Sequence, residues 1–397
     1  MKKLALYGAF DRYNYGDNLM PILIEMFIEK YYPNLFADID VYYVSLSYSD
    51  LSHYKAKKTQ PVSSFLKQCS ADPDQLYFVV VGGEVLGATS SILFCHMKHP
   101  FGVNFIVKKL SKFIPSLINK FAKLFYPVPW EFPYILNKEK IPFGAKVLFN
   151  TVGGNLDRIK NNKEEAVNAI TRADYISARD ARTFESISKF RSVERYPDSV
   201  CAVADMIDDK FLLANTRIDL LSDIGGDYIC FQAAPDKIDA NADQIFTTLT
   251  DLSRKLSKEV VLLPIGYAAG HDDAQLLLDV YKKSEGKFNL LYELNIWEIL
   301  KVIKESDLFI GTSLHGCITA ISYGVACVGL NPKINKLNDF LVSWNVPPLN
   351  KCYEFENLIG VADLFHSIDY GTLRENADQL RLLALENNHK LVNHIID

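Results

Sequence analysis

The chain has 397 residues, a net charge of -5, 49% hydrophobic residues and 23% charged residues. This length and composition are typical of a globular protein with two or three domains, and the negative charge gives no support to a nucleic-acid partner. The 7 cysteines are scattered and form no C-x-x-C pair. This spacing argues against a disulfide framework or a metal site and favours reduced thiols in a cytoplasmic protein.

The first residues, MKKLALYGAFDRYNYGD, have a basic tip and a short apolar run. Because Asp11, Arg12 and Asp17 follow so soon, we interpret this stretch as a first strand rather than a signal peptide. No uninterrupted apolar stretch reaches about 18 residues, so we expect no membrane span. Both observations favour a cytoplasmic location.

Short apolar runs alternate with amphipathic runs along the whole chain. Apolar runs predict strands at 3–10, 40–46, 76–84, 145–154, 173–180, 227–235, 259–266, 288–294, 307–311 and 325–331. Amphipathic runs predict helices at 17–32, 242–257, 272–284, 295–306 and 314–324. Continuous apolar strands separated by helices are typical of parallel sheets that are covered on both faces.

A polar, glycine-containing stretch at 212–226 divides this pattern into two units. We therefore predict an α/β protein with two Rossmann-like domains, 1–215 and 216–370, that face an interdomain cleft. A last helix at 371–397 is expected to pack back on the first domain. In such sheets ligands bind beyond the carboxyl ends of the strands.

One stretch of the first domain, near 96–140, departs from the α/β pattern. Between 101 and 125 it contains five lysines among large apolar residues and no acidic residue. These lysines are Lys108, Lys109, Lys112, Lys120 and Lys123. Pro115 is expected to break or kink a helix here. Two interpretations stay open: a helix pair packed on the domain, or a basic amphipathic helix lying on an anionic membrane surface.

The stretch IGTSLHGCITAISYG, at 310–324, predicts a strand that turns into a helix. The first turn of a helix has unpaired N–H groups and a partial positive charge, so it suits a phosphate or a carboxylate. Small residues let the backbone approach such a ligand, and His315 adds a titratable donor. The small residues are Gly311, Thr312, Ser313 and Gly316. A histidine in this place also serves as a core or capping residue, so that alternative stays open.

Three other predicted strands are followed by polar or glycine residues. Asn14 and Asp17 come after the first predicted strand, Gly83 and Glu84 stand at the end of the strand at 76–84, and Arg179 stands at the end of the strand at 173–180. Asp17 is also suited to capping the helix that follows it, and Arg179 to a structural ion pair with Asp180. If the loops converge, these residues line one cleft.

The motifs YNYGD, VVVGGE, YISARD, YPDSV, LLPIGYAAGHDD and SDLFIGTSLHGCITAISYG, in this order, resemble those of the polysaccharide pyruvyl transferase family. The resemblance spans about 4–340. It implies a GT-B-like fold with the donor on the second domain, and transfer of a pyruvyl group from phosphoenolpyruvate to two sugar hydroxyls as a cyclic ketal. Two departures stand out: many members have an arginine at the position of Ser313 and a third glycine at the position of Glu84.

This reaction needs an acid, a base and an anion clamp, but in principle neither a metal nor a cofactor. We expect His315 and Asp17 to be the catalytic residues, and Arg179 to clamp an anion through its forked guanidinium. The full donor-binding set is expected to be Arg179, Thr312, Ser313, Gly316, Lys333, Lys336 and His271. The acceptor-binding set is expected to be Asn14, Gly83 and Glu84. The lysines and His271 are also compatible with solvated surface positions.

The expected acceptor is a sugar in a cell-surface polysaccharide precursor, such as capsule or exopolysaccharide, carried on a lipid at the cytoplasmic face of the membrane. The basic stretch near 96–140 is compatible with peripheral contact with that membrane. Two alternatives stay open. One is a GT-B glycosyltransferase that uses a nucleotide sugar, and the other is a non-catalytic sugar-binding relative.

Overall fold

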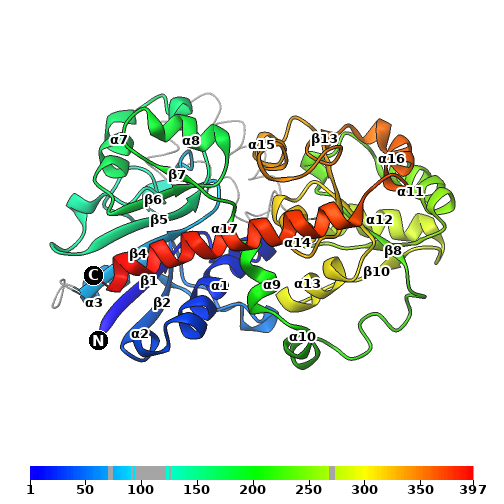
Figure 1. The fold of residues 1–397 in the computed structure, drawn as a ribbon. Helices are drawn as coiled ribbons and strands as arrows, with labels where there is room; N and C mark the ends of the chain where they lie inside the picture. The colour runs from blue at the N-terminus through cyan, green and yellow to red at the C-terminus, as the bar shows by residue number, and fades with distance from the viewer. Residues whose placement is uncertain (70–74, 91–92, 94–121, 125–126, 268–272, 397) are drawn as a thin grey trace.

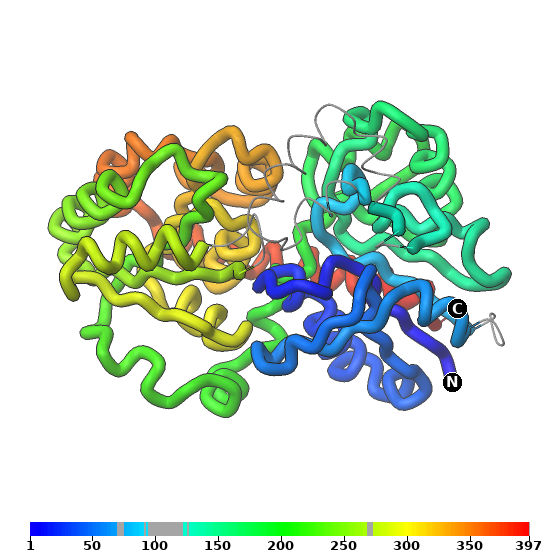
Figure 2. The backbone as a smooth tube through the Cα atoms, turned by 180° about the vertical axis from the view of Figure 1, so that it is seen from behind, coloured from blue at the N-terminus to red at the C-terminus, as the bar shows by residue number. Residues whose placement is uncertain are grey.

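The computed structural model describes residues 1–69, 75–90, 93, 122–124, 127–267 and 273–396. Two α/β units lie side by side, each built on its own parallel sheet (Figure 1). Seen from behind, the two chain termini lie close together on the first unit (Figure 2). The predicted fold class, two doubly wound α/β units, is confirmed.

The first sheet has seven strands in the order β3-β2-β1-β4-β5-β6-β7. The strands are β1 (Lys2–Tyr7), β2 (Ile39–Ser45), β3 (Gln60–Pro61), β4 (Leu76–Val81), β5 (Lys146–Val152), β6 (Tyr175–Ala178) and β7 (Glu194–Arg195). The helices include α1 (Tyr15–Tyr31), α3 (Val62–Cys69), α7 (Lys163–Thr171) and α8 (Ala181–Ser188). All six residues of β4 are buried, because helices cover both faces of the sheet.

The second sheet has six strands in the order β10-β9-β8-β11-β12-β13. The strands are β8 (Tyr228–Gln232), β9 (Glu259–Leu262), β10 (Asn289–Leu290), β11 (Leu308–Gly311), β12 (Ala326–Leu330) and β13 (Cys352–Tyr353). The helices include α11 (Ala242–Leu256), α12 (Ala274–Ser284), α13 (Ile296–Lys304), α14 (Leu314–Ser322), α15 (Asn335–Trp344) and α16 (Leu358–Phe365). Strand order reverses between β1 and β4 and between β8 and β11, where doubly wound sheets bind ligands.

The last helix, α17 (Tyr370–Ile396), joins the two units (Figure 1). Near its start, Leu373 belongs to the core of the second unit. Near its end, the Tyr175 hydroxyl donates to Asn387 Oδ1 over 2.7 Å, and Lys2 Nζ donates to the carbonyl of Ile395 over 2.6 Å. The helix therefore begins on the second domain and ends on the first.

Contacts made by α1 and by the loop before it also hold the two domains together. The Tyr15 hydroxyl lies 2.9 Å from Thr319 Oγ1 of α14, and Tyr15 N donates to the carbonyl of Ile265 over 3.2 Å. The Tyr13 hydroxyl donates to the carbonyl of Leu294 over 2.7 Å. These buried bonds fix the YNYGD loop against the second domain.

The elements differ from the sequence-based prediction mainly at sheet edges. Strands β3, β7 and β13 have two residues each and were not predicted. The strand predicted at 288–294 is reduced to β10, and helix α10 (Asp209–Asn215) reaches into the predicted linker. Such short strands carry too few residues for a periodic pattern.

Most of the basic stretch lies outside the described residues, including Lys108, Lys109, Lys112 and Lys120. Lys123 is described, and it pairs with Glu131 within the domain. Leu124 beside it has 75% of its surface exposed. Within the described ranges, no helix is both long and apolar enough to cross a membrane.

Candidate active site

A cavity of about 590 Å³ opens between the two domains. It lies where β1, β4 and β11 end, which is the position expected for a ligand in this architecture. Predicted residues of the first domain that line it are Asn14, Asp17, Gly83, Glu84 and Arg179. Predicted residues of the second domain that line it are Ser313, His315 and Lys336. The structure thus brings most of the predicted loops to one place.

His315 lies in the first turn of α14, where the side chain of Ser313 caps the helix by accepting from Gly316 N over 3.3 Å. The His315 side chain is 10% exposed, and its Nε2 lies 3.7 Å from Oδ2 of Asp198. Burial alone would raise the pKa of Asp198, but His315 and Arg179 outweigh it and lower that pKa. An ionised carboxylate therefore lies beside the imidazole of His315.

Gly16 of the YNYGD loop lets the first domain approach His315. A side chain at this position would overlap the imidazole ring. The adjacent Asn14 N donates to Asn18 Oδ1 over 3.1 Å, which holds the loop at the start of α1. Asp17 is half-buried in the first turn of α1, and its carboxylate makes no hydrogen bond or ion pair to any residue that the structure describes. Asp17 is thus available to a ligand.

Arg179 follows β6 and is fully buried. Its Nη1 lies 3.3 Å from Asp198 Oδ2, and its Nη2 lies 3.3 Å from Glu84 Oε2. Burial lowers the pKa of Arg179, but Asp198, Asp180 and Glu84 outweigh that effect and raise it. A side chain on Gly153 would overlap the guanidinium, so that glycine makes room for Arg179. Arg179 borders the cavity with its charge already balanced by carboxylates.

Two lysines of the second domain border the cavity, and unlike Arg179 they have lowered pKa values. Lys237 ends a short turn after β8, and Lys336 lies in the first turn of α15. Burial, followed by the charge of Lys336, lowers the pKa of Lys237 to about 8. Burial also lowers the pKa of Lys336, whose Nζ makes no hydrogen bond or ion pair with any described residue. Half-buried cations that repel one another favour binding of an anion.

Other predicted donor residues lie outside the lining. Thr312 is buried: its N donates to Gln232 Oε1 over 3.1 Å, and its Oγ1 accepts from Ala234 N over 3.1 Å. Gly316 packs on Phe309, where a side chain would overlap the ring. Both residues shape the turn before α14 without facing the cavity.

Lys333 is exposed, pairs with Asp239 over 3.0 Å and does not line the cavity. His271 lies outside the described residues.

Several lining residues were missed from the sequence. They are Arg12, Tyr134, Asn155, Arg158 and Lys237. Asp198 was also missed, although it stands in the quoted YPDSV motif. A lysine just after the carboxyl end of a strand was an available signal for Lys237. Tyr134 gave none, because it belongs to the irregular stretch near 96–140.

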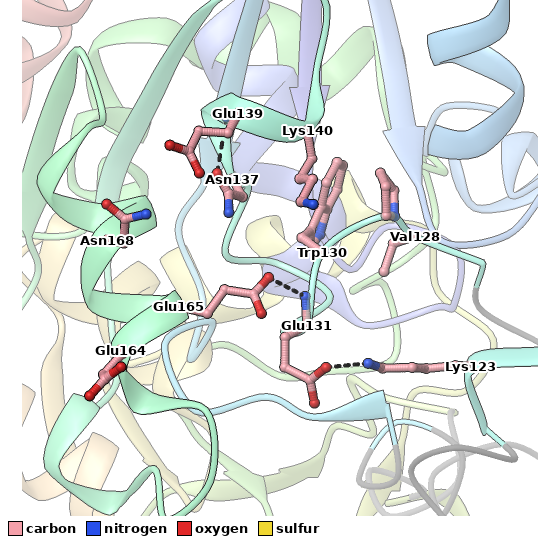
Figure 3. Close-up of a pocket in the computed structure, with 11 residues that line it drawn as sticks. Lys123, Val128, Trp130, Glu131, Asn137, Glu139, Lys140, Glu164, Glu165 and Asn168 are labelled. Carbon is pink, nitrogen blue, oxygen red and sulfur yellow. Dashed lines mark hydrogen bonds and ion pairs between the residues drawn. The ribbon is translucent and has the colours of Figure 1, made fainter.

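A second cavity, of about 620 Å³, lies in the first domain (Figure 3). Its lining includes Trp130, Asn137 and Lys140. Glu131 pairs with Lys123, and the Glu131 amide donates to Glu165 Oε1 over 3.1 Å. No residue predicted from the sequence as a site residue borders this cavity. Within the described ranges, no group of three or more His, Cys, Asp or Glu residues is placed to hold a metal ion.

Comparisons with known proteins bear on the family and the fold of the chain. The family model described as polysaccharide pyruvyl transferase matches residues 14–333. No curated protein sequence matches the chain.

Among solved structures, the chain is similar to Staphylococcus aureus MnaA with UDP, at a TM-score of 0.55 and 13% identity, over 100% of this chain and 96% of that one. It is also similar to the UDP-GlcNAc 2-epimerase of Neisseria meningitidis bound to UDP-GlcNAc, at a TM-score of 0.54 and 12% identity. That match covers 100% of this chain and 99% of the epimerase. A putative UDP-N-acetylglucosamine 2-epimerase from Listeria monocytogenes matches at a TM-score of 0.55 and 11% identity, over 98% of this chain and 94% of that one. At such identities the likeness shows the fold alone, which is GT-B.

Proposed function

Because the chain belongs to the polysaccharide pyruvyl transferase family, we propose that it transfers a pyruvyl group from phosphoenolpyruvate to two hydroxyls of one sugar. The product is a cyclic ketal on a cell-surface polysaccharide precursor. The observation that carries this proposal is the cavity itself. Lys237, Lys336 and the start of α14 border it from the second domain, and Asp17 and Asn14 border it from the first.

The donor carries a phosphate and a carboxylate, so its site requires several positive or N–H donors. We assign the phosphate to Lys237 and Lys336, with the N-terminus of α14 at Ser313 as a further donor. Bringing a phosphate next to two half-buried cations relieves their repulsion, and this relief adds to the binding free energy. Ser313, where many relatives have an arginine, leaves more of this task to the lysines.

The reaction has two steps, and His315 is placed to move protons in both. In the first step, one hydroxyl loses its proton and adds to C2 of the donor while C3 gains a proton. In the second step, the other hydroxyl loses its proton and attacks C2, the bond from C2 to the phosphate oxygen breaks, and inorganic phosphate leaves with the electron pair. The carboxylate of Asp198 lies 3.7 Å from His315 Nε2 and is the acidic group next to this imidazole. Proton transfer and anion binding suffice, so we expect no metal or cofactor.

The acceptor is assigned to the first domain. The carboxylate of Asp17, which bonds to no described residue, can accept a hydrogen bond from a sugar hydroxyl, and Asn14 and Gly83 border the same wall. A lipid-linked acceptor would bring the protein to the cytoplasmic face of a membrane. Among the lysines assigned to that contact, Lys123 is already paired with Glu131.

The proposal is tested by incubating the protein with phosphoenolpyruvate and a panel of lipid-linked glycans. We expect release of inorganic phosphate together with a product whose mass has increased by one pyruvyl ketal. Release of a nucleoside diphosphate from a nucleotide sugar would instead indicate a glycosyltransferase. Ligand-induced stabilisation without turnover of any donor would indicate a sugar-binding relative.

A further inference from the structure

We propose that Glu84 occupies the place of the donor's carboxylate in the ligand-free enzyme, and that phosphoenolpyruvate displaces it. This inference rests on the proposed function. It assigns Arg179 and Arg182 to the carboxylate of the donor, whereas Lys237 and Lys336 take the phosphate. It also gives a role to Glu84, which stands where many relatives have a glycine.

The contacts of Glu84 resemble those that a bound carboxylate would make. Its Oε1 lies 2.8 Å from Arg182 Nη2, and its Oε2 lies 3.1 Å from the same nitrogen and 3.3 Å from Arg179 Nη2. One carboxylate at the border of the cavity thus bridges two guanidinium groups, of which Arg179 also lines the cavity. Guanidinium groups recognise substrate carboxylates through the same paired N–H donors.

Of the three carboxylates around Arg179, Glu84 is the one suited to leave. Asp198 and Asp180 are fully buried, and each accepts a backbone N–H, from Val200 over 3.1 Å and from Thr183 over 2.8 Å. The side chain of Glu84 is 35% exposed and bonds only to the two arginines among the described residues. Moving Glu84 therefore breaks no helix cap, whereas moving either aspartate does.

The surroundings of Glu84 stay in place when its side chain rotates away. Gly153 N donates to the carbonyl of Gly83 over 2.8 Å, which holds the loop backbone. Arg182 is held from the other side of the cleft, since its Nε lies 3.1 Å from Asp339 Oδ2 of α15. Rotation of Glu84 would therefore leave the guanidinium of Arg179 at the border of the cavity, with that of Arg182 held beside it. It would also move a negative charge away from the donor's own charges.

Displacing Glu84 must weaken donor binding, so neutralising it should strengthen that binding. The test measures the KM for phosphoenolpyruvate of the full-length enzyme, by phosphate release, in Glu84→Gln and Glu84→Gly. We expect the KM to fall by roughly 3- to 10-fold in both variants, on the scale of one partly exposed ion pair. Inhibition by inorganic phosphate should improve by a smaller factor, because phosphate alone needs only the lysine side of the site. Glu356→Gln, an exposed glutamate outside the lining, is the matched control.

A KM that is unchanged or raised in both variants, with a wild type that uses phosphoenolpyruvate, would overturn the inference and leave the proposed function standing. An equal improvement for phosphate and phosphoenolpyruvate would also overturn it, because the gain would then be general electrostatics. A wild type that neither binds nor consumes phosphoenolpyruvate would overturn the proposed function, and the inference with it. Glu84→Gly keeps the test open if the glutamine variant fails to fold, since it restores a run of glycines.

Discussion

The two walls of the interdomain cavity carry their positive charge in different ways. On the first domain, Arg179 is fully buried and surrounded by carboxylates, so its charge is balanced within the protein. On the second domain, Lys336 is only half-buried and bonds to no described residue. The comparison teaches that the partners of a cation, more than its side-chain type, decide whether it is free to bind a ligand. Arginine is the better clamp in general, yet in the ligand-free protein Arg179 is already paired, whereas Lys336 bonds to no described residue.

Removing the buried cation should give the largest effect, and the effect should be on stability. Arg179→Met leaves Asp198 and Asp180 buried without their partner, which costs about 3–5 kcal/mol of the free energy of unfolding. Urea denaturation followed by circular dichroism measures this loss. A cost below about 1 kcal/mol would show that the carboxylate network does not depend on Arg179.

The next largest effect concerns catalysis by His315, which lies where the two domains meet. His315→Gln should reduce turnover by about 100-fold or more, the scale expected for the loss of a general acid or base. Its midpoint of thermal unfolding should stay close to that of the wild type, which separates this variant from Arg179→Met. Unchanged turnover would return His315 to a core or capping role.

The smallest effect is a pH dependence of donor binding by the second domain. Lys237 has a pKa lowered to about 8, and its charged form is the one that binds an anion. Raising the pH through that value removes the charge, so the KM for phosphoenolpyruvate should rise by about threefold between pH 7.5 and 8.5. Lys237→Arg should move this rise to higher pH. A flat profile in the wild type over this interval would exclude Lys237 from the donor site.

How far the sequence predicted this structure varies from one element to another. Strands such as β4, buried along their whole length, gave continuous apolar runs, so the two parallel sheets and their convergent loops were predicted correctly. The roles of Asp198 and Lys237 were not predicted, because each depends on a residue more than 90 positions away along the chain. Asp198 lies beside His315, and Lys237 is affected by the charge of Lys336. Tertiary packing brings these groups together, and no local sequence pattern predicts such long-range contacts.

Lys333 and Lys336 show the same limit at short range. They are three positions apart, and the sequence treated them alike. The start of α15 at Asn335 separates them, so that Lys336 borders the cavity while Lys333 is exposed and pairs with Asp239. The pair is therefore a matched comparison of one charge inside the site and one outside it.

The most direct test of the account is a calorimetric titration of phosphoenolpyruvate into the wild type, Lys336→Met and Lys333→Met. The account predicts that Lys336→Met binds at least about tenfold more weakly, the scale of 1.4 kcal/mol for one charged contact, while Lys333→Met binds like the wild type. Equal affinities in all three proteins, or an equal loss in both variants, would contradict the claim that the second domain holds the donor through Lys336.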